Sequence, residues 1–393
     1  MPFVLPRALT ETKAACLVLA FGKLSILEAC SKLPGMIEKA ESPCPRISVL
    51  SLSVPDTSLL PGLAGVHKWA PLVGVLNPGD PDPRTLVDAI SSSFDRVRNL
   101  SISGYELNQE EHESLIRAVL DGLKESGFSK VRLLRPQGDE LKADAVASRE
   151  ALDIVAFPYH GGIGVGLTGW VADAKQYKGR GLEKPAPHAE IAISPRLARL
   201  LVNLSGVGYG QTLLDPFCGS GTILAEGLLK GQRCIGFDID PRTVKDAGRN
   251  LNWLLGGVRS ARYEVKVGDA RRLSMLLDRG KVDGVVTEPL LLPIIRARPR
   301  ESTAEALVAE KEAVYADALA SIAEVLAPGG RAVIVVPVIK TMEGTEVTIT
   351  LEGRPLGLRH YQPGPVGFEY PVRPDFESTR WVGRAVYVFE SPE

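Results

Sequence analysis

The sequence predicts an α/β protein whose C-terminal part is a doubly wound, mostly parallel sheet with helices on both faces. Two observations lead to this fold class. From Ile191 onward, short apolar runs of strand length alternate with segments of helical periodicity, which is typical of parallel strands joined by helical crossovers. In addition, an acidic residue ends one strand after another, as in open parallel sheets that bind a ligand at the carboxyl ends of their strands.

Residues 191–393 supply the elements of this sheet in order. The segment ISPRLARLLVNLSGV predicts the first helix, because Ser194 is a favourable N-cap and Pro195 suits the first helical position. The closing segment WVGRAVYVFE predicts an antiparallel last strand. The predicted parallel strands lie in TLLDPF, RCIGFDI, YEVKVGD, DGVVTEP and RAVIVVPV, and the helices between them lie in GTILAEGLLKG, DPRTVKDAGRNLNWLL and AEALVAEKEAVYADALASIAEVL.

Residues 1–155 predict a separate α+β region that carries no chemical motif of its own. Short strands such as ACLVLAF and RISVLSLSV alternate with helical patterns. In ESLIRAVLDGLKES the apolar residues recur at helical spacing, and Gly127 follows as a stop signal. Residues 156–190 are expected to form a linker, because KQYKGRGLEKPAP is polar and rich in Gly and Pro.

Composition limits the class of protein. The chain has 46 Lys and Arg against 47 Asp and Glu, a net charge of −1, so nucleic-acid binding would depend on local patches. Five cysteines without CxxC spacing argue against a metal site or a disulfide framework. No apolar stretch approaches the roughly 20 residues of a membrane helix, and the N-terminus lacks a signal-peptide pattern. We therefore expect a soluble cytoplasmic protein that does not span a membrane.

The first candidate site is the glycine turn in LLDPFCGSGT. Asp215 ends a strand, and Gly219 and Gly221 allow a tight turn before a helix N-terminus, whose free N–H groups suit a carboxylate or phosphate. The turn lacks the third glycine of the dinucleotide fingerprint and the lysine of a P-loop, so a purely structural turn remains an alternative. The next two strands strengthen the assignment. Asp238 ends its strand where an acid binds ribose hydroxyls, and Asp269 ends the strand after it.

Glu288 and Pro289 end the fourth strand. An exocyclic amine is a poor nucleophile because its lone pair is delocalised into the ring. A carboxylate and a backbone carbonyl that accept its two N–H bonds would free that lone pair for attack on a methyl group. This chemistry requires no covalent cysteine, so we expect Cys218 to pack rather than react. The alternative is that Glu288 is an ordinary solvated acid at a strand end.

The motifs DPFCGSG, GFDID, GDA and TEP, in this order, resemble those of class I S-adenosylmethionine-dependent methyltransferases with a Rossmann-like sheet. More narrowly, they are similar to those of the THUMP-containing tRNA guanosine-N2 methyltransferases that modify position 10. The segments ISPRLARLLVNLSGV, NLNWLL and AKQYKGRG also resemble this family. The resemblance implies methyl transfer from S-adenosylmethionine to the N2 amino group of a guanosine in tRNA, and a THUMP-like, RNA-binding N-terminal region.

The resemblance also implies roles for individual residues. Asp238 would hold the cofactor ribose, and Asp269 with Ala270 would hold the adenine. Glu288 and Pro289 would meet the guanine amino group. The methionine part of the cofactor would be bound by the glycine turn, which comprises Asp215, Phe217, Cys218, Gly219, Ser220 and Gly221.

One departure from the family pattern affects the target base. The family continues with D-P-P-Y, whose aromatic ring stacks on that base, whereas Leu290 and Leu291 follow Pro289 here. Base–aromatic stacking contributes about 1–3 kcal/mol per base, so weaker base binding is expected. Beyond this loop, the alternating Arg296, Arg298 and Arg300 would meet RNA phosphates or form a solvated basic loop.

Two other functions remain open. A methyltransferase of the same fold could act on DNA adenine or a protein amide, because fold alone does not fix function. A cofactor-binding RNA adaptor without catalysis would fit the missing aromatic ring. The sequence also leaves open whether a partner subunit is needed.

Overall fold

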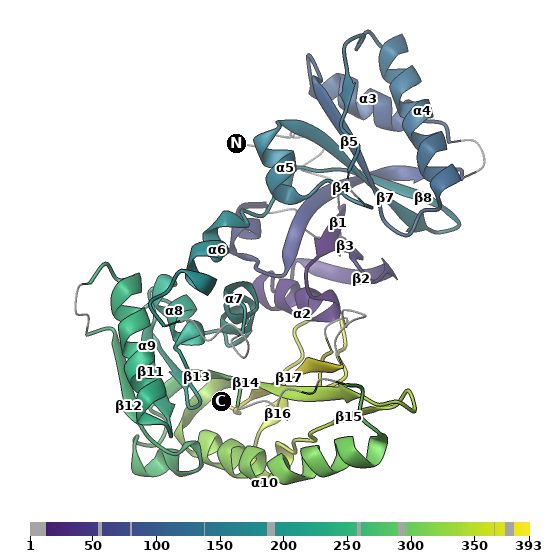
Figure 1. Cartoon of the computed structure of the whole chain (residues 1–393). Coiled ribbons are helices and arrows are strands. Elements are labelled where there is room, and N and C mark those ends of the chain that lie inside the picture. The colour runs from purple at the N-terminus through teal and green to yellow at the C-terminus, as the bar shows by residue number, and fades with distance from the viewer. Residues whose placement is uncertain are drawn as a thin grey trace. The chain divides into compact units, whose positions relative to one another are not determined.

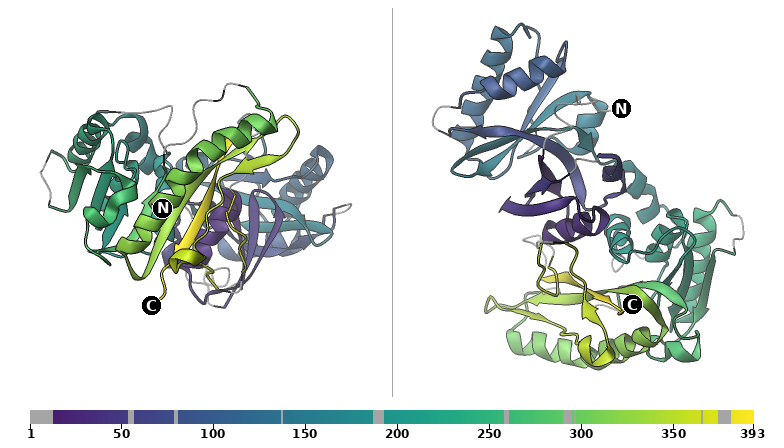
Figure 2. Two further views of the ribbon diagram at one scale, coloured as in Figure 1. Left: turned by 90° about the horizontal axis from the view of Figure 1, so that it is seen from below. Right: turned by 180° about the vertical axis from the view of Figure 1, so that it is seen from behind.

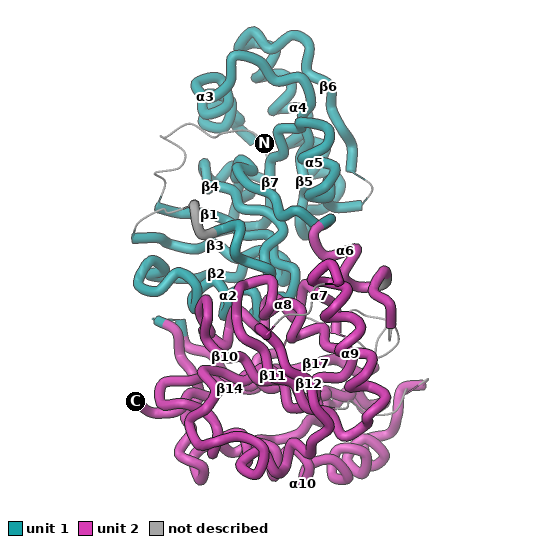
Figure 3. The backbone as a smooth tube through the Cα atoms, turned by 90° about the vertical axis from the view of Figure 1, so that its left-hand side faces the viewer, with its two compact units in different colours: residues 1–175, 364–366 teal, residues 176–363, 367–393 magenta. Residues whose placement is uncertain are grey.

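The computed structural model describes residues 13–53, 57–78, 81–136, 138–186, 193–257, 261–289, 295, 297–364, 366–373 and 381–393. The chain forms two compact units (Figure 3): unit 1 comprises Met1–Lys175 with Gly364–Val366, and unit 2 comprises Gln176–Pro363 with Gly367–Glu393. In the described part of the chain, no helix is long and apolar enough to cross a membrane.

Unit 1 is built on one nine-stranded mixed sheet, in agreement with the predicted α+β region. Its strand order is β2-β3-β1-β4-β8-β7-β5-β6, and β9 pairs with β4. The strands are β1 (Ala14–Leu19), β2 (Ile37–Cys44), β3 (Ile47–Leu52), β4 (Val66–Leu76), β5 (Asn99–Gly104), β6 (Arg132–Leu133), β7 (Ala151–Tyr159), β8 (Gly162–Leu167) and β9 (Trp170–Val171). The helices are α2 (Gly22–Lys32), the 3-10 turn η1 (Thr57–Gly62), α3 (Arg84–Ser93), α4 (Gln109–Glu125) and α5 (Ala143–Ser148).

Helix α4 confirms the helix predicted from ESLIRAVLDGLKES, and Figure 1 shows it beside α3. Asn108 and Glu111 form a reciprocal capping box, in which each side chain accepts a hydrogen bond from the other residue's backbone N–H. The helix ends before Gly127, which has a φ of 95°. Its apolar face is buried at Leu115, Ile116, Val119 and Leu123.

The segment predicted as a linker, residues 156–190, is largely structured. It contains the end of β7, strands β8 and β9, and helix α6 (Lys175–Leu182), and the two units divide at Lys175. The Gly- and Pro-rich composition of residues 175–187 indicated a linker, but the first part of that stretch folds as α6. A Cβ atom at Gly166 would lie 2.7 Å from the Cys16 sulfur, so this glycine permits close packing within a sheet and does not mark a loop.

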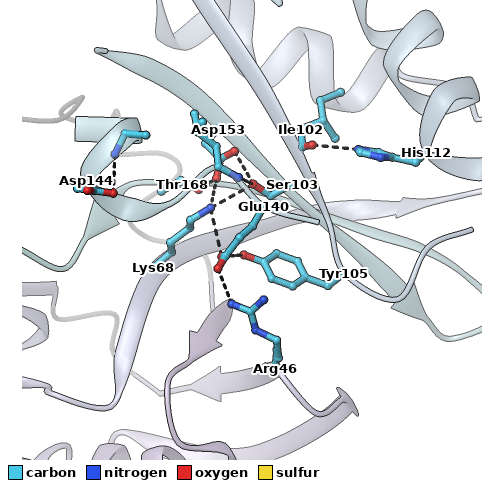
Figure 4. Close-up of polar contacts among 12 residues, drawn as sticks. Arg46, Lys68, Ile102, Ser103, Tyr105, His112, Glu140, Asp144, Asp153 and Thr168 are labelled. Atoms are coloured by element: carbon cyan, nitrogen blue, oxygen red, sulfur yellow. Dashed lines mark hydrogen bonds and ion pairs between the residues drawn. The ribbon is translucent and has the colours of Figure 1, made fainter. Parts of the chain in front are cut away.

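A buried ion pair between Lys68 on β4 and Asp153 on β7 lies at the centre of unit 1 (Figure 4). The Lys68 Nζ–Asp153 Oδ2 distance is 2.7 Å, and both side chains are 0% exposed. Ser103 accepts a hydrogen bond from Lys68 at 3.1 Å and donates one to Asp153 at 2.8 Å. Because charges removed from water must be paired, these contacts fix β4, β5 and β7 to one another.

The same network extends to the loops of unit 1. Glu140 accepts hydrogen bonds of 2.5 Å from both Arg46 and the Tyr105 hydroxyl. The Lys68 ammonium lies 3.9 Å from the same carboxylate. Burial and the neighbouring Glu140 charge raise the pKa of Tyr105 well above its usual range, so its hydroxyl stays a donor.

Unit 2 is the doubly wound sheet that the sequence predicts. Its strand order is β12-β11-β10-β13-β14-β17-β16, with β15 beside β14. The strands are β10 (Thr212–Asp215), β11 (Arg233–Asp238), β12 (Tyr263–Val267), β13 (Val282–Thr287), β14 (Leu326–Lys340), β15 (Glu346–Thr348), β16 (Arg359–His360) and β17 (Val382–Glu390). Strands β10–β14 are parallel, and β17 is antiparallel to β14, which confirms the predicted last strand.

Helices cover both faces of this sheet. Figure 1 shows α7 (Pro195–Leu204) and α8 (Thr222–Leu229) on one face and α10 (Glu301–Val325) on the other, and Figure 2 shows α10 running along β14 and β17. The remaining elements are α9 (Pro241–Leu254) and the 3-10 turns η2 (Ala270–Met275) and η3 (Arg354–Leu356). The predicted N-cap of α7 is confirmed, because the Ser194 side chain accepts from the Leu197 N–H at 3.2 Å.

We predict that breaking the buried ion pair destabilises unit 1. Asp153→Asn should lower its free energy of unfolding by about 3–5 kcal/mol, because the buried Lys68 loses its hydrogen-bonded counter-charge and keeps only Glu140, 3.9 Å away. Hydrogen exchange of the β4 and β7 amides in denaturant would measure the loss.

The apolar double variant Lys68→Met/Asp153→Leu should be less destabilised than the single variant. Arg84→Met, which removes an exposed ion pair with Asp82, is the control and should leave exchange unchanged. A single variant as stable as the parent protein would contradict the account.

Candidate functional site

The carboxyl ends of β10, β11, β12 and β13 open into one pocket of about 560 Å³. The structure therefore brings together the acids that the sequence placed at four strand ends. The predicted residues that line the pocket are Asp215, Phe217, Cys218, Gly219, Ser220, Asp238, Asp269, Ala270, Glu288 and Pro289. Gly221 lies within the same turn as the N-cap of α8.

Asp215 links two strand ends at the floor of this pocket. Its side chain is 1% exposed, and its Oδ1 atom accepts from the Thr287 hydroxyl at 2.8 Å and from the Phe217 N–H at 3.2 Å. Burial raises the pKa of this carboxyl to about 7, although both hydrogen bonds act in the opposite direction. Asp215 can therefore change its charge near neutral pH.

The glycine turn is held by the next acid along the sheet edge. Gly219 and Gly221 have φ values of 51° and 82°, in the left-handed region that favours glycine. The Gly219 N–H donates to Asp238 Oδ2 at 3.1 Å, and the Asp240 N–H donates to Asp238 Oδ1 at 2.9 Å. Asp238 thus ties the turn to the start of α9 while each of its oxygens keeps a lone pair for a ligand.

Cys218 packs against its neighbours, which agrees with the expectation that its thiol does not react. Burial raises the pKa of its thiol well above the ordinary value. A Cβ atom at Gly236 would lie 3.0 Å from the Cys218 Cβ, so the two residues pack closely where the turn meets β11. Cys218 also lines the pocket.

Asp269 is bound within its own loop. Its carboxylate accepts from the Arg271 N–H at 3.0 Å and pairs with the Arg271 guanidinium at 2.7 Å. These hydrogen bonds lower the pKa of Asp269 below its usual range. Its role toward an adenine amino group stays a prediction, and Arg271 would compete for the same oxygens.

Glu288 is not the solvated acid of the alternative interpretation. Its side chain is 9% exposed, and its carboxylate accepts a hydrogen bond from Arg384 on β17. Burial raises the pKa of Glu288, and the Arg384 charge opposes that rise. Pro289 is buried beside it and lines the same pocket.

Lys184 is a site residue that the sequence analysis missed. Its side chain is 7% exposed, and its Nζ atom donates to Ser220 Oγ and Thr222 Oγ1, each at 2.9 Å. Both partners line the pocket and are uncharged. Burial lowers the pKa of Lys184. An isolated lysine in a polar segment gives no sequence signal, and only the fold brings it to the glycine turn.

Asn250 on α9 holds the Lys184 segment in place. Its Nδ2 atom donates to the Ser220 carbonyl at 2.9 Å and to the Ala186 carbonyl at 3.1 Å. Its Oδ1 atom accepts from the Ala186 N–H at 2.9 Å. Buried at 5% exposure, Asn250 thus joins the glycine turn to the segment that carries Lys184.

The predicted basic loop is only partly described. Leu290, Leu291 and Arg296 lie outside the described residues. The Arg298 guanidinium lies over the Trp381 ring, 5.5 Å from its centroid, whereas Arg300 is exposed just before α10. Arg298 therefore packs within unit 2, and Arg300 is free to meet solvent or a ligand.

Comparisons with known proteins agree with this fold. Residues 185–345 match a family model described as UPF0020, RMKL-like, methyltransferase domain. Of the relatives, a tRNA (guanine(10)-N2)-dimethyltransferase of Methanothermobacter thermautotrophicus is 42% identical over 139 residues, which are 35% of this chain and 37% of the relative. A tRNA (guanine(10)-N2)-dimethyltransferase of Pyrococcus abyssi is 30% identical over 188 residues, 48% of this chain and 51% of the relative.

The chain thus aligns with between about a third and a half of the length of these two relatives. Among solved structures, TrmN from Thermus thermophilus is 17% identical with a TM-score of 0.51, covering 96% of this chain and 99% of that one. This similarity shows a shared fold over nearly the whole chain.

We predict that Asp215 titrates near pH 7 in the ligand-free protein. Thr287→Val should raise its pKa further, because it removes a donor that favours the ionised carboxylate. The carboxyl ¹³C shift of Asp215 would report its titration midpoint in the parent protein and in Thr287→Val. The signal is assigned by its absence in Asp215→Asn. Thr243→Val, at another pocket-lining threonine, is the control. A midpoint near pH 4, or one unchanged in Thr287→Val, would contradict this account of the site.

Proposed function

We propose that unit 2 binds S-adenosylmethionine and that the protein methylates the exocyclic N2 amino group of a guanosine in tRNA. One observation carries the proposal. Four consecutive strand ends bring Asp215, Asp238, Asp269 and Glu288 to one pocket, in the part of the chain that matches a methyltransferase domain.

The residues of the pocket fit this cofactor. The buried ammonium of Lys184, which donates to the uncharged hydroxyls of Ser220 and Thr222, suits the methionine carboxylate at the N-terminus of α8. Asp215, once ionised, suits the positive charges of the methionine part. Asp238 has lone pairs free for ribose hydroxyls, and the exposed Ile239 beside it offers an apolar surface for adenine. When bound, S-adenosylmethionine supplies an electrophilic methyl group on a positively charged sulfur.

Glu288 and Pro289 form the acceptor end of the pocket. The Glu288 carboxylate would accept a hydrogen bond from one N–H group of the target amine, and a backbone carbonyl of this loop would accept one from the other N–H group. These contacts localise the nitrogen lone pair and aim it at the methyl group. Duplex bases are out of reach, so the target nucleotide must be extruded into the pocket.

The choice of a guanosine in tRNA as the substrate rests on the relatives, which are named tRNA (guanine(10)-N2)-dimethyltransferases. A THUMP-like unit 1 would bind the RNA. The exposed Arg300 would contact RNA phosphates, whereas Arg298 packs against Trp381 and Arg296 lies outside the described residues. The chain has a net charge of only −1, so such contacts must be local. A tRNA substrate also fits a cytoplasmic location.

We predict that Lys184→Met weakens binding of S-adenosylmethionine by about 10–100-fold. This is the loss in affinity expected when one charge-assisted hydrogen bond to the carboxylate is removed. Calorimetry would measure it. The affinity for methylthioadenosine, which has no carboxylate, should be unchanged, and Lys245→Met on the exposed side of α9 should leave both affinities intact. Equal losses for both ligands would show that Lys184 is only structural.

Transfer of labelled methyl groups tests the function itself. The purified protein and labelled S-adenosylmethionine are incubated in parallel with unmodified tRNA, with duplex DNA and with protein as candidate substrates. Label should enter tRNA and be absent with Asp238→Ala, which removes the predicted ribose ligand. Label in DNA or protein alone would identify a different amino methyltransferase. Cofactor binding without any transfer would indicate an adaptor.

A further inference from the structure

Arg384 reaches the acceptor loop from a strand that is not adjacent to it. Glu288 follows β13, whereas Arg384 lies on β17, and β14 separates the two strands in the sheet. Arg384 stands opposite Pro337 of β14 in the antiparallel register. Its Nε atom donates a hydrogen bond to Glu288 Oε1. The long side chain therefore extends along the carboxyl edge of the sheet to meet the acid.

This contact is not needed to hold β17. The register of β17 against β14 runs without a break from Arg331–Glu390 to Ile339–Val382. The strand also buries Ala385, Val386, Tyr387, Val388 and Phe389. The Arg384 side chain is itself 24% exposed, so it could remain in solvent if it had no other role.

The charge state of Glu288 depends on this contact. A buried carboxyl without a partner takes up a proton, and a protonated carboxyl has lost an acceptor for the N–H bonds of an amine. Glu288 is nearly buried, and among the described residues Arg384 is the one cation paired with it. The same bond occupies Oε1, and among the described residues no hydrogen bond is made to Oε2, so this oxygen is left for a ligand.

We propose that Arg384 is the positioning residue of the acceptor site: it orients Glu288 through Oε1 and keeps it ionised, so that Oε2 can accept the N–H bond of the target amine. This inference rests on the proposed function. It also explains how a glutamate can serve at this position, because the ion pair fixes a side chain with one more rotatable bond than aspartate.

Two other titratable groups face Glu288 among the described residues. Asp215 accepts a hydrogen bond from Thr287, the residue before Glu288. The Glu288 charge is one of the causes that raise the pKa of Asp215. Tyr315 comes from α10 and has a buried hydroxyl without a hydrogen-bond partner in the described structure. Burial and the nearby Glu288 charge raise the pKa of Tyr315, so it stays neutral. Arg384 is therefore the group that offsets burial at Glu288.

The test compares Arg384→Met with Arg384→Lys. Arg384→Met should raise the pKa of Glu288, because burial then acts unopposed, and the acid limb of the rate–pH profile should move to higher pH. Methyl transfer to tRNA at pH 7 should fall by at least 10-fold and recover partly as the pH rises. Arg384→Lys keeps the charge and should restore most of the lost rate. Affinity for S-adenosylmethionine should be unchanged in both variants.

Arg359→Met is the matched control. It removes another Arg–Glu pair of the same sheet, at the opposite end of β17, where Arg359 bonds Glu390 at 3.0 Å. Its rate–pH profile should equal that of the parent protein. In a Glu288→Gln background, Arg384→Met should cause no further loss of methyl transfer, because the acid on which Arg384 acts is gone.

The outcomes separate this inference from the proposed function. A parent protein that methylates tRNA, with an unshifted profile in Arg384→Met, would overturn the inference alone. A parent protein without any transfer would overturn the proposed function. The carboxyl ¹³C shift of Glu288 would then test whether Arg384 keeps Glu288 ionised. An equal titration midpoint in the parent protein and in Arg384→Met would refute this effect.

Discussion

The hydrogen bond from the Thr287 hydroxyl to Asp215 is the contact on which the site of unit 2 depends. It joins the ends of β10 and β13 at 2.8 Å and partners a carboxyl that is almost fully buried. Asp215 in turn fixes the Phe217 N–H, and Asp238 fixes the Gly219 N–H. The acids of the sheet edge thus shape the turns that form the pocket, and they keep free lone pairs toward its interior.

The charges around the pocket follow the same logic. A cation, Lys184, lies at the glycine turn and is held by two hydroxyls. Acids at Asp215 and Asp238 follow, and the last acid, Glu288, is paired with Arg384 beyond it. A ligand with an anionic end, a cationic centre and ribose hydroxyls matches this order, and an amine matches the Glu288 end. Burial strengthens each of these interactions because little water competes.

Local sequence patterns were sufficient for the sheet and for four of its strand ends. The N-cap Ser194 and each acid of the pocket can be read from one short segment of sequence. The partners of those acids are not. Arg384 meets Glu288 only because β17 inserts beside β14, and Lys184 gives no local signal. The Gly- and Pro-rich stretch 175–187 resembled a linker, although its first part folds as helix α6.

The most direct test is mass spectrometry of nucleosides from unmodified tRNA incubated with the purified protein and S-adenosylmethionine. We predict a rise in N2-methylguanosine that is lost with Glu288→Ala, while cofactor binding persists. Methylation of another nucleoside, or N2-methylguanosine that forms equally well without Glu288, would contradict the assignment of Glu288 as the acceptor of the target amine.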